Sequence, residues 1–237
     1  SAPDGDASGR AVGTRLDALA AAGHPVFTID VPSPAALAGE FFRWEFATAV
    51  VGARLGVNPF DEPNVREAKV RTQAQLDARA TTGAFRLDPP FEPGEGYSRR
   101  EFRREGATIP AGRRYVALLD FLPADPRRSK LFDTLRAALR RRLGLATTYG
   151  VGPRYLHSTG QFHKGGTNSG IFLLLTADDA TETAVPGANC SFSVLKHAQA
   201  LGDFAALCAN ERHVIHVHIA DKDADFSREL EKVVNWA

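Results

Sequence analysis

One polar segment of the chain, residues 157–166 (HSTGQFHKGG), carries side chains that could do acid–base chemistry. Imidazole titrates near neutral pH, so His157 could pass a proton to the ring oxygen of a sugar. The alternative is that His157 caps or hydrogen-bonds the start of a helix. We expect His163 and Lys164, which follow in the same segment, to lie on a solvated helix face.

The glycine-rich stretch around this segment, residues 147–170, could bind an anionic, polyhydroxylated ligand. Glycine lets the backbone approach a ligand closely, and backbone N–H groups bind anions. The side chains able to add charge or hydrogen bonds are Arg154, Ser158, Thr159 and Lys164. A sugar phosphate matches this set of groups.

A second segment, residues 58–69 (NPFDEPNVREAK), has the pattern of a turn followed by a helix. Asn58 and Pro59 favour the turn, and Pro63 suits the first position of the helix. On this pattern alone, Glu62 and Lys69 are solvated residues of a capped surface helix.

Three histidines, His213, His216 and His218, fall on one predicted strand, with the last two on the same face. That spacing can bind zinc, but the sequence offers no adjacent Cys or carboxylate that would complete a ligand set. Asp178 and Asp179 are expected in a solvated loop. We therefore predict no metal site and no cofactor.

The elements that must position these residues alternate between strands and helices after residue 114. Runs of β-branched and apolar residues predict the strands, and helical periodicity predicts the helices. Strands are expected at 115–121, 145–149, 170–176 and 213–219, and helices at 127–143, 192–209 and 226–235. This alternation predicts an α/β three-layer sandwich with a mainly parallel, flavodoxin-like sheet. Ligands of such sheets bind beyond the carboxyl ends of the strands.

The part of the chain before residue 115 has a different pattern. Helices are predicted at 14–22 and 34–55, with a strand at 26–31 between them. From residue 70 to residue 114 the chain has clustered Arg, Pro and Gly but few aliphatic residues, which is typical of a linker or a surface excursion. We therefore predict three parts: residues 1–80, a linker at 81–114 and an α/β domain at 115–237.

The composition excludes several classes of partner. The 237 residues carry 29 Lys+Arg and 28 Asp+Glu, which gives a formal net charge of +1. Such a chain has no global field that would draw it to nucleic acid or to an anionic membrane, so we expect neither partner.

No stretch approaches the roughly 18 consecutive apolar residues of a membrane span. The two cysteines form no framework, which favours a reducing compartment, and we expect a cytoplasmic protein. Because the chain starts at Ser1 and contains no methionine, we expect it to be a processed product or a fragment rather than to begin at a translational start.

The two polar segments together resemble the glucose-6-phosphate isomerase family, and most closely the C-terminal part of bifunctional transaldolase/glucose-6-phosphate isomerases. The similarity lies in residues 21–26 (AAGHPV), 41–69 (FFRWEFATAVVGARLGVNPFDEPNVREAK), 115–123 (YVALLDFLP) and 150–176 (GVGPRYLHSTGQFHKGGTNSGIFLLLT). The resemblance implies a sugar-isomerase-like fold. A family motif of the form N-P-F-D-Q-P-x-V-E-x-x-K places the active-site lysine at Lys69. A motif H-x-x-x-Q places the ring-opening histidine at His157 and its glutamine at Gln161.

The resemblance implies an enzyme that interconverts glucose 6-phosphate and fructose 6-phosphate through ring opening and a cis-enediol. Lys69 and His157 would be its catalytic residues. The substrate-binding residues would be Glu62, Arg154, Ser158, Thr159, Gln161 and Lys164. The phosphate loop and the base of the family are not found in this sequence, so preceding isomerase domains would have to complete the site. A preceding transaldolase domain and a homodimer are left open, and we expect the isolated chain to be inactive.

Departures from the family motifs favour an alternative function. Glu62 stands where the family has Gln, and Arg66 stands where it has Glu. The histidine motif also follows the lysine motif, whereas in ordinary isomerases it precedes it. The alternative is a non-catalytic sugar-phosphate-binding or assembly domain on the same scaffold. A third interpretation, a nucleic-acid binder using the arginines at 99–104 and 140–142, lacks an accompanying aromatic platform.

Overall fold

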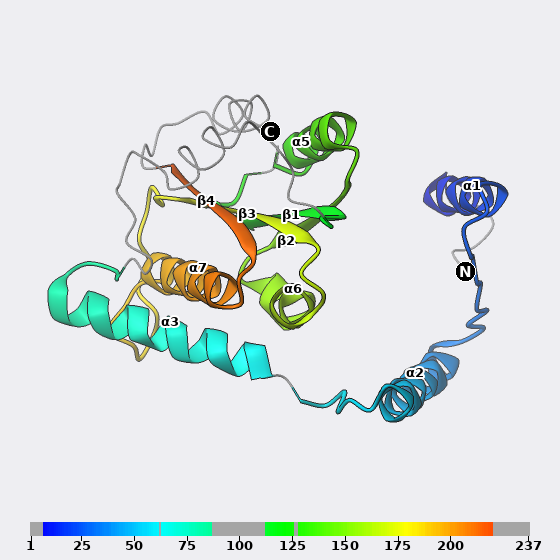
Figure 1. The fold of residues 1–237 in the computed structure, drawn as a ribbon, viewed down its shortest axis with the longest axis horizontal. Helices are drawn as coiled ribbons and strands as arrows, with labels where there is room; N and C mark the ends of the chain where they lie inside the picture. The colour runs from blue at the N-terminus through cyan, green and yellow to red at the C-terminus, as the bar shows by residue number, and fades with distance from the viewer. Residues whose placement is uncertain (1–6, 62, 87–111, 126–127, 220–237) are drawn as a thin grey trace. The chain divides into compact units, whose positions relative to one another are not determined.

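The computed structural model describes residues 7–61, 63–86, 112–125 and 128–219. It divides the chain into two compact units, Ser1–Asp61 and Glu62–Ala237, and each is described by itself. Figure 1 shows the elements of both units with their labels. Among the described residues, no helix is both long enough and apolar enough to cross a membrane.

The first unit contains two helices, α1 (Ala7–Ala21) and α2 (Pro34–Leu55). The Ser33 side chain caps α2 by accepting a hydrogen bond from the backbone N–H of Ala36 at 3.2 Å, and Gly56 ends the helix at φ 70°. Residues 26–31 adopt no regular secondary structure, so the predicted strand is wrong. A strand needs a neighbour to pair with, and none of the described segments pairs with this one.

The second unit is built on a four-stranded, all-parallel sheet within the described residues. Its strands are β1 (Tyr115–Phe121), β2 (Ala146–Val151), β3 (Gly170–Ala177) and β4 (His213–Ile219), in the spatial order β2-β1-β3-β4. The chain leaves β1 for β2 on one side and later returns to pair β3 on the other side. The strand order therefore changes direction between β1 and β3, which is where ligands of such sheets bind.

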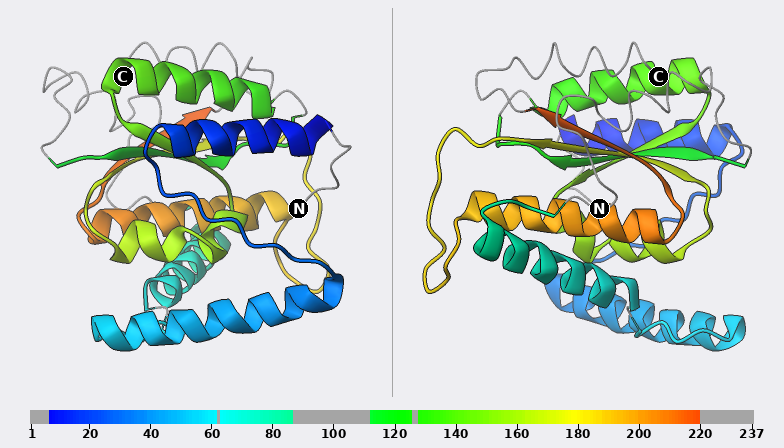
Figure 2. Two further views of the ribbon diagram at one scale, coloured as in Figure 1. Left: turned by 90° about the vertical axis from the view of Figure 1, so that its right-hand side faces the viewer. Right: turned by 60° about the vertical axis from the view of Figure 1, so that its left-hand side comes forward.

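Helices cover both faces of this sheet, as the two views in Figure 2 show. On one face α5 (Arg128–Leu143) packs Phe132, Leu135 and Leu139 against Leu118 and Leu173 of the sheet. On the other face α7 (Phe192–Ala209) packs residues that include Phe204 and Leu207 against the sheet. The predicted α/β three-layer sandwich with a parallel, flavodoxin-like sheet is therefore confirmed.

Two further helices lie on the α7 side of the sheet (Figure 1). The short helix α6 (Gly160–Gly165) follows a 3-10 turn, η1 (Arg154–His157), after β2. The long helix α3 (Pro63–Thr82) contacts both α7 and α6. Residues 70–82, predicted to begin a linker, are therefore helical. Most of α3 was predicted to belong to a first part at residues 1–80. In the structure α3 belongs to the second unit, together with the sheet.

Several predicted elements lie partly or wholly outside the described residues. Of the predicted linker at 81–114, residues 87–111 are not described, and the predicted helix at 226–235 falls entirely outside. The bounds predicted for β1, β4, α2 and α7 agree with the structure.

Candidate functional site

The structure brings the two polar segments of the sequence into direct contact. The side-chain Oε1 of Gln161 accepts a hydrogen bond from the backbone N–H of Asn64 at 3.2 Å. In return, Gln161 Nε2 donates to Asn64 Oδ1 at 2.9 Å. Asn64 lies in the first turn of α3, where backbone N–H groups have no partner within the helix, so Gln161 caps α3 from another element. Gly165 leaves room for this contact, since a Cβ there would lie 2.5 Å from Asn64 Oδ1.

A second set of polar contacts fixes the same turn of α3. Glu67 accepts hydrogen bonds from Arg71 Nε at 3.0 Å, from Asn210 Nδ2 at 3.1 Å and from Asn64 Nδ2 at 3.4 Å. Burial opposes ionisation of Glu67, but the hydrogen bonds from Asn210, Arg71 and Asn64 outweigh it and lower the pKa of its carboxyl group. The Asn210 contact ties α3 to the end of α7.

The two predicted catalytic residues are both exposed in the second unit. Lys69 lies on α3, next to Ala68, which is buried. His157 is the last residue of η1, one short turn before α6. The helix that carries Lys69, α3, contacts α6, and α6 in turn contacts η1, which carries His157.

The predicted substrate-binding residues fall into different environments. Arg154, Ser158 and Thr159 are exposed on η1 and the turn that follows it. The Ser158 hydroxyl donates to the backbone carbonyl of Tyr155 at 3.2 Å. Gln161 is engaged with Asn64, as described above, and Glu62 lies outside the described residues.

Lys164 is buried and held in an ion pair inside the protein. Its side chain is 1% exposed, and its Nζ lies 2.5 Å from Asp203 Oδ1 on α7. The other carboxylate oxygen of Asp203 accepts a hydrogen bond from the Tyr155 hydroxyl at 2.5 Å. Burial, followed by the charge of Asp203, raises the pKa of Tyr155 well above its ordinary value. Contact between Lys164 and a substrate would therefore require this pair to open.

His163 is buried as well, so the solvated helix face expected for His163 and Lys164 is wrong. Burial lowers the pKa of His163 to about 4, and it does so despite the opposing effect of Asp203. The His163 Nδ1 lies 3.3 Å from the Tyr115 hydroxyl. Its ring also contacts Phe172. His163 is thus a neutral core residue at neutral pH, because α6 turns it towards the sheet.

A buried carboxylate occupies the carboxyl end of β1. Asp120 accepts hydrogen bonds from the Tyr149 hydroxyl at 2.7 Å and from the backbone N–H of Leu122 at 2.9 Å, and it pairs with Arg128 at 3.2 Å. Burial raises the pKa of Asp120, although these partners oppose the shift. Since the contacts come from β2, α5 and the chain after β1, Asp120 ties three elements together.

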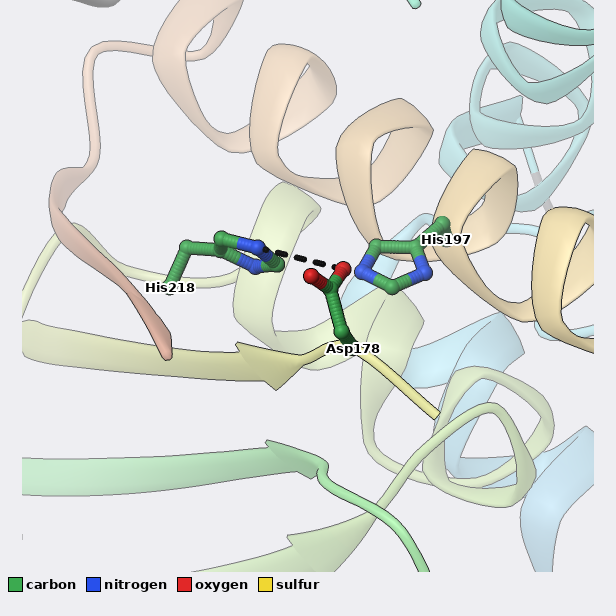
Figure 3. A group of neighbouring side chains, drawn as sticks. All are labelled: Asp178, His197 and His218. Atoms are coloured by element: carbon green, nitrogen blue, oxygen red, sulfur yellow. Dashed lines mark ion pairs between the residues drawn. The ribbon is translucent and has the colours of Figure 1, made fainter. Parts of the chain in front are cut away.

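A histidine–carboxylate cluster lies at the carboxyl ends of β3 and β4. It comprises Asp178 directly after β3, His197 on α7 and His218 near the end of β4 (Figure 3). One ligand atom from each residue lies within 4.8 Å of the other two. The His218 Nε2 lies 3.5 Å from Asp178 Oδ1. These residues could hold a metal ion.

The sequence alone predicts only one part of this cluster. It placed His216 and His218 on one face, and in the structure both rings contact Thr176 Oγ1, at 2.8 Å and 2.9 Å. The missing carboxylate comes from Asp178, because β3 pairs in parallel with β4 and Thr176 lies opposite His218. The position of Asp178 in the sequence could have indicated this, because Asp178 directly follows a buried parallel strand and so lies at the carboxyl edge of the sheet.

Comparisons with known proteins leave the family open. No protein-family model matches the chain, and no curated protein matches it. Among solved structures, the chain is similar to the crystal structure of a hypothetical protein from Thermus thermophilus, with a TM-score of 0.47 and 13% sequence identity. That similarity covers 73% of this chain and 41% of the other. It assigns neither a family nor a function.

Proposed function

We propose that this chain is the C-terminal region of a glucose-6-phosphate isomerase, which interconverts glucose 6-phosphate and fructose 6-phosphate. The observation that carries the proposal is the pair of hydrogen bonds between Asn64 and Gln161. These residues belong to the two segments that resemble the isomerase family, and they are 97 positions apart in the sequence. Contact between the segments is what a shared site requires.

The proposed chemistry uses the exposed residues of the two segments. Ring opening requires a proton at the ring oxygen and the loss of one from the O1 hydroxyl, and we assign these transfers to His157 and Lys69. The charge of Lys69 then stabilises the oxyanion of the cis-enediol. A carboxylate from a preceding domain moves the proton from C2 to C1. The preceding domains also supply the loop that binds the phosphate group of the substrate. We expect the whole protein to be cytoplasmic.

The substrate-binding roles follow the exposure of the side chains. Arg154, Ser158 and Thr159 can reach a sugar phosphate directly, because all three are exposed near His157. Gln161 acts by positioning, since its amide is used to cap α3. Glu62 keeps the substrate-binding role that the motif implies.

A coupled assay of glucose 6-phosphate isomerisation in the full-length parent protein tests this proposal. Lys69→Ala and His157→Ala should each lower kcat by at least about 100-fold, the usual range for groups that transfer protons. Lys130→Ala is the matched control, because Lys130 is exposed and lies outside the segments that resemble the isomerase family. Activity of the Lys69→Ala protein within a few-fold of wild type would show the assignment to be wrong.

A non-catalytic sugar-phosphate-binding domain is the competing function, favoured by Glu62 and Arg66 at positions where the family has Gln and Glu. Isothermal titration of the 237-residue chain with fructose 6-phosphate separates the two. The binding domain predicts saturable binding by the chain, together with unchanged parental activity when Lys69 and His157 are replaced. The isomerase predicts loss of that activity, and little or no turnover by the isolated chain.

A further inference from the structure

We infer that Asp178, His197 and His218 form a binding site for one divalent first-row transition-metal ion such as Zn²⁺. This site goes beyond the proposed isomerase and does not depend on it. Two imidazole nitrogens and one carboxylate oxygen are a common ligand set for such ions. The three residues come from the end of β3, from α7 and from β4, so only the folded chain brings them together.

The spacing of the three donors suits a single ion. With metal–ligand bonds of about 2.0–2.1 Å, the ligand atoms of a tetrahedral site lie about 3.3 Å apart. The separation of His218 Nε2 and Asp178 Oδ1, 3.5 Å, is close to that edge length. All pairs lie within 4.8 Å, so closure of the site needs only small side-chain movements.

The ring of His218 is already oriented for coordination through Nε2. Its Nδ1 lies 2.9 Å from Thr176 Oγ1, which in turn lies 2.8 Å from His216 Nε2. Metal-bound histidines usually hydrogen-bond through the second ring nitrogen, which fixes the tautomer and the ring orientation. Thr176 and His216 provide this support, and Nε2 of His218 is left facing Asp178 (Figure 3).

His197 provides an independent observation that points to a ligand. Its ring hydrogen-bonds the backbone of Ser193, one turn earlier on α7. Its Nε2 is buried, and no hydrogen-bond partner for it occurs among the described residues. A buried polar atom without a partner needs an explanation. Figure 3 shows a ring nitrogen of His197 facing the Asp178 carboxylate, where an ion held by all three residues would satisfy it.

The charges around the cluster favour a cation. Lys196, next to His197, is paired with Asp179 at 2.6 Å, so these two charges offset each other. The carboxylate of Asp178 then leaves the cluster with one negative charge. A simple ion pair between His218 and Asp178 would need a protonated ring and would leave His197 Nε2 without a partner.

The cluster is also partly accessible to solvent, since the Asp178 side chain is 42% exposed and that of His218 is 27% exposed. Three protein donors with an open position are typical of zinc sites that bind water or a substrate, whereas structural sites are closed by four protein ligands.

Titration of the tag-free, chelator-treated chain with Zn²⁺ and with Co²⁺ tests this inference. Calorimetry should give one ion per chain. Bound Co²⁺ should show the visible absorption of a Co²⁺ ion with a low coordination number. His197→Ala, His218→Ala and Asp178→Asn should each weaken binding by at least about 100-fold, more than loss of a supporting residue does. His24→Ala is the matched control and should bind as wild type, because His24 is exposed in the first unit.

A spectroscopic measurement keeps the test decisive if a variant fails to fold. In the wild-type chain, Zn²⁺ should shift the imidazole NMR signals of His197 and His218 but leave the signal of His24 in place. Absence of saturable binding by the wild-type chain would overturn the inference. Unchanged affinity in all three folded variants would also overturn it, since the ion would then be bound elsewhere.

Discussion

The ion pair between Lys164 and Asp203 gives Lys164 a structural role that its sequence context does not predict. In the sequence Lys164 belongs to a polar, glycine-rich segment, which favours a solvated or ligand-binding role. In the structure both side chains are 1% exposed. The partner could have been suspected, because Asp203 lies within an otherwise apolar run of α7 (ALGDFAAL) and a lone carboxylate on a buried face needs a counter-charge. Which cation meets it depends on the packing of α6 on α7, which no local pattern specifies.

Breaking this pair should destabilise the protein strongly. Lys164→Met leaves the Asp203 carboxylate buried with the Tyr155 hydroxyl as its neutral partner, so the free energy of unfolding should fall by about 3–5 kcal/mol. Urea denaturation measures this change. The double variant Lys164→Met/Asp203→Asn removes both charges and keeps an acceptor for Tyr155, so it should recover at least about 1 kcal/mol. Additive losses in the double variant would contradict this account.

The buried His163 should make stability depend on pH. Its pKa is about 4 in the folded protein and about 6.5 when unfolded, so between these values the unfolded chain binds more protons. The contribution of neutral His163 to the free energy of unfolding is complete above about pH 6.5. It is lost as the pH falls towards 4, at about 1.4 kcal/mol per pH unit. Urea denaturation of wild type and His163→Gln over this range measures the difference. A difference that does not change with pH would rule out the neutral, buried ring.

At the level of elements, the sequence predicts those whose apolar pattern matches their burial. β1 and β4 carry β-branched or aliphatic runs, and α2 and α7 have strong caps, so their bounds could be predicted. The predicted strand at 26–31 has a suitable composition but no pairing partner among the described segments, and pairing is not a local property. The length of α3 was missed because the helix buries only Ala68 and Gln75, so it shows no apolar stripe.

Close approach of α3 to α7 depends on a glycine. A Cβ at Gly202 would lie 2.6 Å from Thr72 Oγ1 and 2.8 Å from the backbone nitrogen of Thr72. Gly202→Ala should therefore force the helices apart and lower the free energy of unfolding by about 1–3 kcal/mol, as overpacking does. Urea denaturation measures the loss.

Gly39→Ala is the matched control for this prediction. A Cβ at Gly39, on α2, meets nothing within 4 Å, so this variant should be neutral or more stable by up to about 1 kcal/mol. Equal effects of the two substitutions would mean that the contact between α3 and α7 does not require glycine.

At the level of the whole molecule, the described hydrophobic core lies in the second unit. The buried hydrophobic side chains begin at Ala68 and belong to the sheet, α3, α5, α7 and the segments joining them. Of the residues of α2, all of which are described, only Gly52 is buried, and Phe42 on the same helix is 70% exposed. Within the first unit, α2 therefore contributes no buried large hydrophobic side chain.

Residues 62–237 should consequently fold without the first unit. Near-ultraviolet circular dichroism of this fragment should show a cooperative thermal transition, with a midpoint within a few degrees of the corresponding transition in the full chain. The comparison needs only the two purified proteins. A fragment without a cooperative transition would mean that residues 1–61 contribute essential contacts to the sheet unit.

The sequence could predict the candidate sites only in pieces. The glycine-rich segment and the lysine segment were each recognisable, but their contact through Asn64 and Gln161 depends on how α3 packs. The histidine cluster needed the register of β3 against β4 and the rotational position of His197 on α7. Strand register and helix rotation are tertiary properties, since they follow from packing between distant segments.

Two of the contacts that hold α3 limit which sequence changes this helix can tolerate. Asn64 contacts α6 and Thr72 contacts α7, and these residues are eight positions apart, a little over two helical turns. One residue inserted between them would rotate one contact by about 100° relative to the other, so both could not form at once. Lys69 lies between Asn64 and Thr72 on α3. The direction in which its side chain leaves the helix is therefore set by the number of residues that separate it from these two contacts. Substitutions should therefore accumulate between these two residues far more readily than insertions or deletions.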